Sequence, residues 1–99
     1  MSTVSSGDVS PAFPAGISSS AKRDLKRLFK RNRKSFDAVD SAIKELEQNP
    51  RMAGVEQLTM EDAIHRLRVG DYRILFKIDN LGRSISIERV RHRRDVYRH

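Results

Sequence analysis

The chain has 99 residues and a formal net charge of +7, from 20 Lys and Arg against 13 Asp and Glu, and it contains no cysteine. This length suits one domain with a small core, and the lack of cysteine excludes disulfides and thiolate chemistry. No apolar run reaches the roughly 18 residues of a membrane span, and residues 1–20 lack the apolar segment of a signal peptide. We therefore expect a cytoplasmic protein without a membrane partner.

The positive charge is concentrated in two blocks. Residues 22–34 hold eight basic residues against one acidic residue, and residues 89–99 hold five arginines against one aspartate. A balance of this kind favours a polyanionic partner, either a nucleic acid or an acidic protein.

The N-terminal part of the chain divides into two segments. Residues 1–11 contain Ser, Gly and Pro and almost no large apolar groups, so we expect a disordered extension, with 12–99 forming a single domain. Phe13, Ala15 and Ile17 then alternate, which suits a short strand. Because Pro14 has no N–H to donate, that strand should lie at the edge of a sheet.

Two amphipathic helices follow. The first is expected over about 21–33, after candidate N-caps in the serines at 18–20. The second should be capped by Ser35 and stopped by Asn49-Pro50. Its apolar stripe is Phe36, Val39, Ile43 and Leu46. The short link between the two helices predicts a hairpin.

After an expected loop over 51–63, the apolar period changes from 3.6 to 2. Strands are expected over 64–69, 72–79 and 84–90. Gly70-Asp71 suits a type II′ turn between the first two strands, and residues 80–82 mark the second turn. The fold class is therefore α+β: a two-helix hairpin packed on a small antiparallel sheet of three strands, or four with the N-terminal one.

Pairing around the Gly70-Asp71 turn sets Arg68 opposite Arg73. Leu67 and Ile74 then face the core, and four basic side chains project from the other face: Arg66, Arg68, Arg73 and Lys77. A like-charged cross-strand pair costs roughly 0.2–1 kcal/mol, so this face is expected to meet an anion. The alternative is an ordinary solvated sheet face. Strict alternation would send Arg89 and Arg91 inward unless a bulge intervenes, so the register beyond Glu88 stays open.

Few kinds of catalysis remain open to these residue types. No cluster has metal-ligand spacing, there is no Gly-rich phosphate loop, and His65 alternates with the core face as a packed histidine would. Arginines with His92 and Tyr97 are enough for RNA cleavage by the RNA's own 2′-hydroxyl. That reaction needs orientation, charge stabilisation and proton transfer, but no protein nucleophile.

Most of the chain from about Phe13 onward resembles the RelE/ParE superfamily of toxins, and its RelE branch in particular. The matching stretches are AKRDLKRL (21–28), NPR (49–51) with the following Gly54 and Leu58, HRLRVGDYRILFKID (65–79) and ERVRHRRDVYR (88–98). The resemblance implies a RelE-like fold and the toxin of a type II toxin–antitoxin system. Such a toxin cleaves mRNA in the ribosomal A site and inhibits translation without a metal or cofactor. Its implied partners are the ribosome, mRNA and a neutralising RelB-like antitoxin, with operator DNA bound only through the antitoxin.

The resemblance also implies site residues. The positions that match family catalytic residues are Arg66, Arg68, Arg73, His92, Arg93 and Tyr97. Arg73 and Arg93 would stabilise the phosphate, and Tyr97 would stack on a base. Arg holds its proton more firmly than Lys, so Arg66 and Arg68 are poor candidates for a general base. His92 is therefore the better candidate for the acid or base. We expect RNA contacts from Lys22, Arg23, Lys26, Arg27, Lys30, Lys77 and Arg91.

Two other functions remain open. One is a ParE-like inhibitor of DNA gyrase, which would need neither His92 nor Tyr97. The other is a catalytically inactive homologue that only binds nucleic acid, which would show strongly salt-dependent binding and no cleaved product.

Overall fold

The computed structural model describes residues 12–59, 63–81 and 83–97, and for 96 and 97 the backbone alone. Its helices are α1 (Ser19–Arg31), α2 (Arg33–Gln48) and the short 3₁₀ helix η2 (Arg93–Tyr97). Its strands are β1 (Ala15–Ile17), β2 (Val55–Gln57), β3 (Ile64–Val69), β4 (Tyr72–Asp79) and β5 (Ser84–His92). The predicted extension over 1–11 lies outside the described residues.

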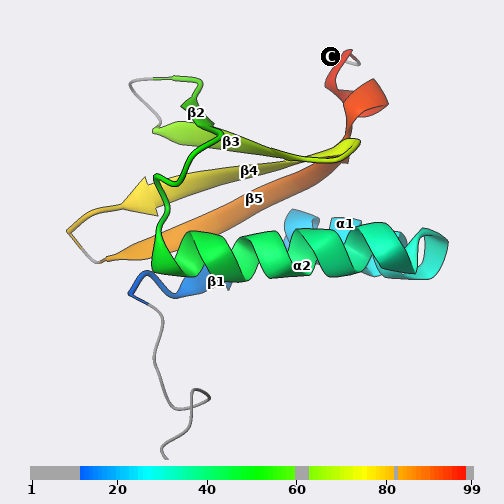
Figure 1. Cartoon of the computed structure of the whole chain (residues 1–99), viewed down its shortest axis with the longest axis horizontal. Helices are drawn as coiled ribbons and strands as arrows, with labels where there is room; N and C mark the ends of the chain where they lie inside the picture. The colour runs from blue at the N-terminus through cyan, green and yellow to red at the C-terminus, as the bar shows by residue number, and fades with distance from the viewer. Residues whose placement is uncertain (1–11, 60–62, 82, 98–99) are drawn as a thin grey trace, which may run out of the picture.

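The strands form one sheet in the order β1-β5-β4-β3-β2, and both long helices lie together on one side of it (Figure 1). The predicted α+β architecture is confirmed, and β1 is an edge strand as Pro14 required. The sheet has five strands rather than three or four, and β1 pairs with β5 in parallel rather than antiparallel. The extra strand, β2, falls in the expected loop over 51–63 and pairs with β3.

Capping side chains set the helix boundaries. Ser18 Oγ accepts from the Ala21 N–H at 3.0 Å and donates to the Glu88 carbonyl at 2.8 Å, so it both caps α1 and joins it to β5. The prediction that Ser35 caps the second helix was wrong. Asn32 Oδ1 accepts from the Ser35 N–H at 3.0 Å, and this single residue ends α1 and begins α2. Asparagine is a strong N-cap. Helix α2 ends before Asn49-Pro50, as predicted.

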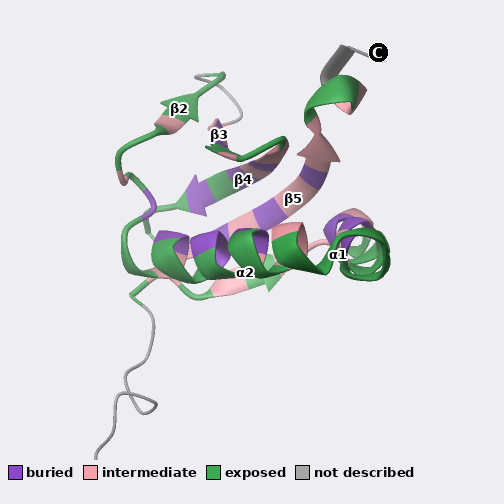
Figure 2. Cartoon of the chain, turned by 45° about the vertical axis from the view of Figure 1, so that its right-hand side comes forward, coloured by how far each residue is buried: buried purple, intermediate pink, exposed green. Residues whose placement is uncertain are grey.

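The core lies between the helices and the sheet, where buried residues of both layers face one another (Figure 2). Its largest fully buried side chains are Phe76, Leu46, Ile74, Ile87 and Val39. His65 is also buried, with its ring stacked on Phe76 at 5.5 Å between centroids, so the prediction of a packed histidine is confirmed.

The predicted β3–β4 register is confirmed, with Arg68 opposite Arg73 and Val69 opposite Tyr72 across a turn in which Gly70 has φ +60°. The register that was open beyond Glu88 is settled by a bulge. Ile87 pairs with Phe76 whereas Arg89 pairs with Leu75, so Glu88 is the extra residue. The bulge returns Val90 to the core and sets Arg91 opposite Arg73.

Candidate functional site

Three arginines lie side by side across the sheet. Arg68 on β3 and Arg91 on β5 both pair with Arg73 on the strand between them. Arg73 is partly buried, and its Nε is shielded from solvent without a hydrogen-bond acceptor in the described part of the chain. Its Nη1 donates only a long bond, 3.5 Å, to the Arg93 carbonyl. Apart from this bond, the guanidinium of Arg73 has no hydrogen-bond acceptor among the described residues.

The C-terminal segment returns toward this row of arginines. The Arg93 N–H donates to the Asp71 carbonyl at 2.7 Å, and the Arg93 Nε lies 3.9 Å from Asp71 Oδ1. These contacts hold the start of η2 against the β3–β4 turn, as Figure 1 shows at the end of the sheet.

An open cleft of about 410 Å³, the turn cleft, lies between this turn and η2. Four arginines are among the seven residues that line it: Arg68, Gly70, Asp71, Tyr72, Arg73, Arg93 and Arg94. Four arginines face one carboxylate here, so the electrostatic potential favours an anion. Three of the predicted catalytic residues, Arg68, Arg73 and Arg93, come together in this cleft.

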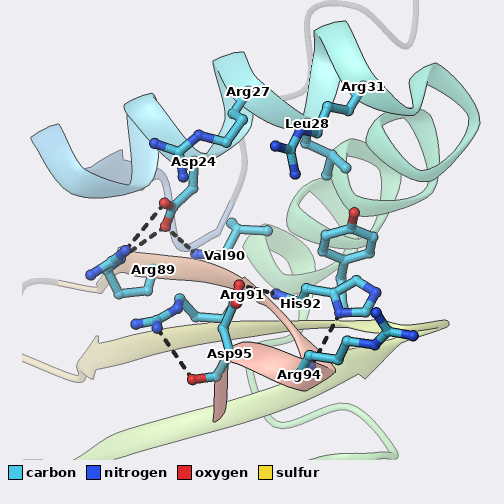
Figure 3. A pocket seen from close by; sticks show the side chains of 11 residues that line it. Asp24, Arg27, Leu28, Arg31, Arg89, Val90, Arg91, His92, Arg94 and Asp95 are labelled. Atoms are coloured by element: carbon cyan, nitrogen blue, oxygen red, sulfur yellow. Dashed lines mark hydrogen bonds and ion pairs between the residues drawn. The ribbon is translucent and has the colours of Figure 1, made fainter. Parts of the chain in front are cut away.

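A larger open cleft of about 640 Å³, the helix cleft, lies between α1 and the last part of β5 (Figure 3). Its eleven lining residues come from both walls and from η2: Asp24, Arg27, Leu28, Arg31, Tyr72, Arg89, Val90, Arg91, His92, Arg94 and Asp95. Tyr72 and Arg94 line both clefts. The predicted residues Arg27, Arg91 and His92 lie in this second cleft, apart from the predicted catalytic arginines.

The contacts of His92 favour one tautomer. Its Nδ1 accepts from the Arg94 N–H at 3.1 Å, and its ring meets Tyr72 edge-on at 5.0 Å between centroids. A neutral imidazole that accepts at Nδ1 carries its proton on Nε2. In its neutral form, His92 therefore presents an N–H donor at Nε2.

The other predicted site residues lie outside both clefts. Arg66 forms an ion pair with Glu56 of β2, and its guanidinium lowers the pKa of that carboxyl. Lys77 is exposed four residues from Arg73, or about 13 Å along the strand. Tyr97 has its backbone in η2, and its side chain falls outside the described part. The remaining predicted residues are exposed on α1: Lys22, Arg23, Lys26 and Lys30.

One important residue, Asp24, was not predicted from the sequence. Its side chain is buried against β5 (Figure 3), where it accepts from Arg89 Nε at 2.9 Å, Arg89 Nη2 at 3.2 Å and the Val90 N–H at 2.9 Å. The hydrogen bonds with Arg89 raise the pKa of that guanidinium. A signal was present, because Asp24 is the one acid in a basic block and shares a helical face with Ala21 and Leu28.

Among the residues that the structure describes, no group of three or more His, Cys, Asp or Glu could hold a metal ion. Nor, within those ranges, is any helix long and apolar enough to cross a membrane. The polar side chains that line the two clefts carry guanidinium, carboxylate, imidazole and phenol groups.

Several solved structures with this fold come from toxin–antitoxin systems. A chain of the RelBE2 toxin–antitoxin complex from Mycobacterium tuberculosis is 28% identical, with a TM-score of 0.68 over 82% of this chain and 98% of that chain. A chain of the archaeal RelE–RelB complex from Pyrococcus horikoshii is 20% identical, with a TM-score of 0.72 over 83% and 96%. The YoeB/ParE toxin from Agrobacterium tumefaciens is 13% identical, with a TM-score of 0.71 over 81% and 98%.

No curated protein sequence matches the chain. A family model does match residues 16–97, and its description is the ParE toxin of the type II toxin–antitoxin system parDE. The match spans both helices, the sheet and η2, and it confirms the superfamily suggested by the sequence motifs. The chain therefore belongs to the ParE toxin family of type II toxin–antitoxin systems, within the RelE/ParE superfamily.

Proposed function

We propose that this toxin is a metal-independent endoribonuclease that cleaves mRNA in the ribosomal A site and so inhibits translation. The observation that carries the proposal is the turn cleft, where Arg68, Arg73 and Arg93 converge around a space open to solvent. Guanidinium groups bind phosphate oxygens through paired, fixed donors. Three of them in one cleft suit a phosphate whose charge increases during the reaction.

In the proposed reaction, the 2′-hydroxyl of the RNA loses its proton to solvent water as its oxygen attacks the adjacent phosphorus, and the bond to the 5′-oxygen of the next nucleotide breaks. The products are a 2′,3′-cyclic phosphate and a 5′-hydroxyl. Arg73, which lines the turn cleft, is assigned to the non-bridging oxygens together with Arg93. Arg68 lies beside Arg73 and would orient the attacking nucleotide.

Proton transfer is assigned chiefly to His92. Arginine is a poor base because it holds its proton at ordinary pH, and Arg66 is already paired with Glu56. In its imidazolium form His92 would protonate the departing 5′-oxygen, since its ring contacts Tyr72 in the wall shared by the two clefts. Tyr97 is retained as a base-stacking residue at the end of η2.

We further propose that the toxin is cytoplasmic and is neutralised by a cognate RelB-like antitoxin, through which alone it would meet operator DNA. Two of the solved structures with this fold are complexes of RelE with RelB. The strong positive charge of the chain suits both an acidic antitoxin segment and ribosomal RNA.

The deciding experiment is induction of the full chain in cells, followed by primer extension to map RNA ends on several transcripts. We expect cuts in phase with codons, confined to translated regions. Growth arrest without such cuts, or cuts that do not depend on translation, would count against a ribosome-dependent nuclease.

Inhibition of DNA gyrase is the second candidate, because the matching family model carries the ParE name. It predicts that the purified toxin blocks supercoiling by gyrase in the absence of RNA. It also predicts that Arg73→Ala keeps its toxicity, whereas the nuclease proposal predicts that this variant loses it.

A further inference from the structure

We propose that the helix cleft is a second nucleotide-binding subsite, which holds the sugar–phosphate backbone of the RNA strand whose scissile phosphate lies in the turn cleft. This inference rests on the proposed function, because it extends the path of the same substrate. It assigns a role to α1 that the cleavage step does not require.

The charge balance of the helix cleft supports an anionic ligand. Both carboxylates in its lining are already engaged, since Asp24 accepts from Arg89 and Val90 and Asp95 accepts from the His92 N–H at 3.3 Å. The three guanidinium groups of Arg27, Arg31 and Arg94 have no acceptor within the described ranges. An open cleft that contains these free cations attracts phosphate groups.

The spacing of the cations suits a nucleic-acid backbone. Arg27 and Arg31 are one turn apart on α1, with a rise of about 6 Å between them, which is comparable to the separation of neighbouring phosphates in an extended strand. Figure 3 shows both side chains on α1, across the cleft from Arg91, His92 and Arg94. A strand lying between the two walls would contact cations on both sides.

Aromatic groups also line this cleft. The rings of Tyr72 and His92 meet edge-on at 5.0 Å, and both residues belong to its lining. Aromatic side chains beside a basic groove are the usual combination in proteins that bind single-stranded nucleic acid, because every base offers a face for stacking.

The two clefts are adjacent. Tyr72 and Arg94 belong to the lining of both, so a ligand that leaves the turn cleft past Tyr72 enters the helix cleft directly. One RNA strand can therefore follow a basic path around the end of the sheet where β4 begins and β5 finishes.

The composition of the lining favours RNA over a protein helix. An amphipathic helix binds through an apolar face and needs an apolar groove, whereas the aliphatic residues that line the helix cleft are Leu28 and Val90. The other nine lining residues are charged, histidine or tyrosine, which leaves little apolar surface for such a helix.

The test uses labelled 2′-O-methyl oligonucleotides of three and eight nucleotides, which lack the attacking 2′-hydroxyl and so are bound but not cleaved. Their affinity for the full chain is measured by fluorescence anisotropy at several salt concentrations. The variants are Arg27→Ala/Arg31→Ala for the helix cleft and Arg73→Ala/Arg93→Ala for the turn cleft. The charge-matched control is Lys34→Ala/Lys44→Ala, two exposed lysines of α2 outside both clefts.

We expect Arg27→Ala/Arg31→Ala to bind the eight-nucleotide probe about tenfold more weakly, with trinucleotide binding nearly unchanged. Its slope of log affinity against log salt should be shallower by about 1.4, because each phosphate that an arginine neutralises on a single strand contributes about 0.7 to that slope. Arg73→Ala/Arg93→Ala should weaken binding of both probes, and the control should weaken neither by more than about twofold. Circular dichroism and thermal melting check that each variant is folded.

The outcomes separate this inference from the proposed function. If Arg27→Ala/Arg31→Ala behaves like the control on both probes, the subsite is wrong, while the primer-extension result still decides the nuclease proposal. If the long probe alone is weakened but no cleavage is found in cells, the subsite stands as an RNA-binding site and the nuclease proposal fails. Unchanged RNA affinity together with weaker binding of a purified antitoxin would assign the cleft to the antitoxin instead.

Discussion

The carboxylate of Asp24 accepts hydrogen bonds from Arg89 and Val90 at the end of β5, on the edge where β1 no longer pairs with that strand. Strand β1 pairs only with Ile85, Ser86 and Ile87. Beyond them, one Asp24 oxygen accepts from both the Val90 N–H and Arg89 Nε, each at 2.9 Å. A buried N–H without an acceptor is costly, so Asp24 satisfies the strand edge just after the bulge.

Replacement of Asp24 by alanine should therefore destabilise the fold. It leaves the Val90 N–H without its acceptor and Arg89 without its counter-charge, and we expect a loss of about 2–3 kcal/mol in the free energy of unfolding. Urea denaturation measures the change. The control is Asp37→Ala, which removes an exposed i,i+4 partner of Arg33 and should cost less than about 0.5 kcal/mol. Equal losses in the two variants would show that the buried contacts of Asp24 add nothing.

The sequence predicts those features of the fold whose cause lies within one short stretch of the chain, and misses those that depend on distant residues. The β3–β4 register follows from alternation and from a two-residue turn with Gly70 at its first position, both visible in one short stretch. The bulge at Glu88 lies instead beside two distant hydrogen bonds: Ser18 Oγ donates to the Glu88 carbonyl, and the Val90 N–H donates to Asp24. These partners lie far away in the sequence and leave no trace in the pattern of β5 itself. Strand β2 was missed because three residues are too few to show a period.

Gly70 should tolerate substitution poorly even though its surroundings are open. A Cβ at this position would meet no atom within 4 Å, so any cost comes from the backbone, whose φ of +60° disfavours other L-residues. We expect Gly70→Ala to lower the free energy of unfolding by about 1 kcal/mol. Gly70→Asn should lower it less, since Asn adopts this conformation more readily. Thermal melts of the two variants make the comparison, and the reverse order would contradict a backbone cause.

The Glu56–Arg66 pair predicts a defined pH dependence. The Arg66 guanidinium lowers the pKa of the Glu56 carboxyl below its ordinary value. A carboxyl with a depressed folded-state pKa stabilises the fold above its unfolded pKa, and this contribution disappears as the pH falls through the folded pKa. NMR titration should thus place the pKa of Glu56 low in the wild type and nearer its ordinary value in Arg66→Ala. The same low pKa in both proteins would refute the assigned cause.

The candidate site was predicted in part, and the missing part again has a distant cause. Arg68, Arg73 and Arg93 meet in the turn cleft because they flank one turn and the segment that packs on it. His92 was grouped with them because its position matches a family catalytic residue. Its register partner, however, is Tyr72, and its ring lines the helix cleft beside α1, which no local pattern around residue 92 reveals.

The sharpest prediction for activity concerns Arg73. Lysine at this position would keep the charge but lose the planar set of donors, including the buried Nε that has no acceptor in the described structure. We expect Arg73→Lys, like Arg73→Ala and Arg93→Ala, to lower RNA cleavage more than about tenfold, the typical effect of losing one charge-stabilising donor. Primer-extension cut frequency at equal protein levels measures this, with Lys44→Ala as the folded control outside both clefts. Full activity in Arg73→Lys would mean that Arg73 contributes only its charge, and the assignment of its guanidinium to the phosphate oxygens would have to be abandoned.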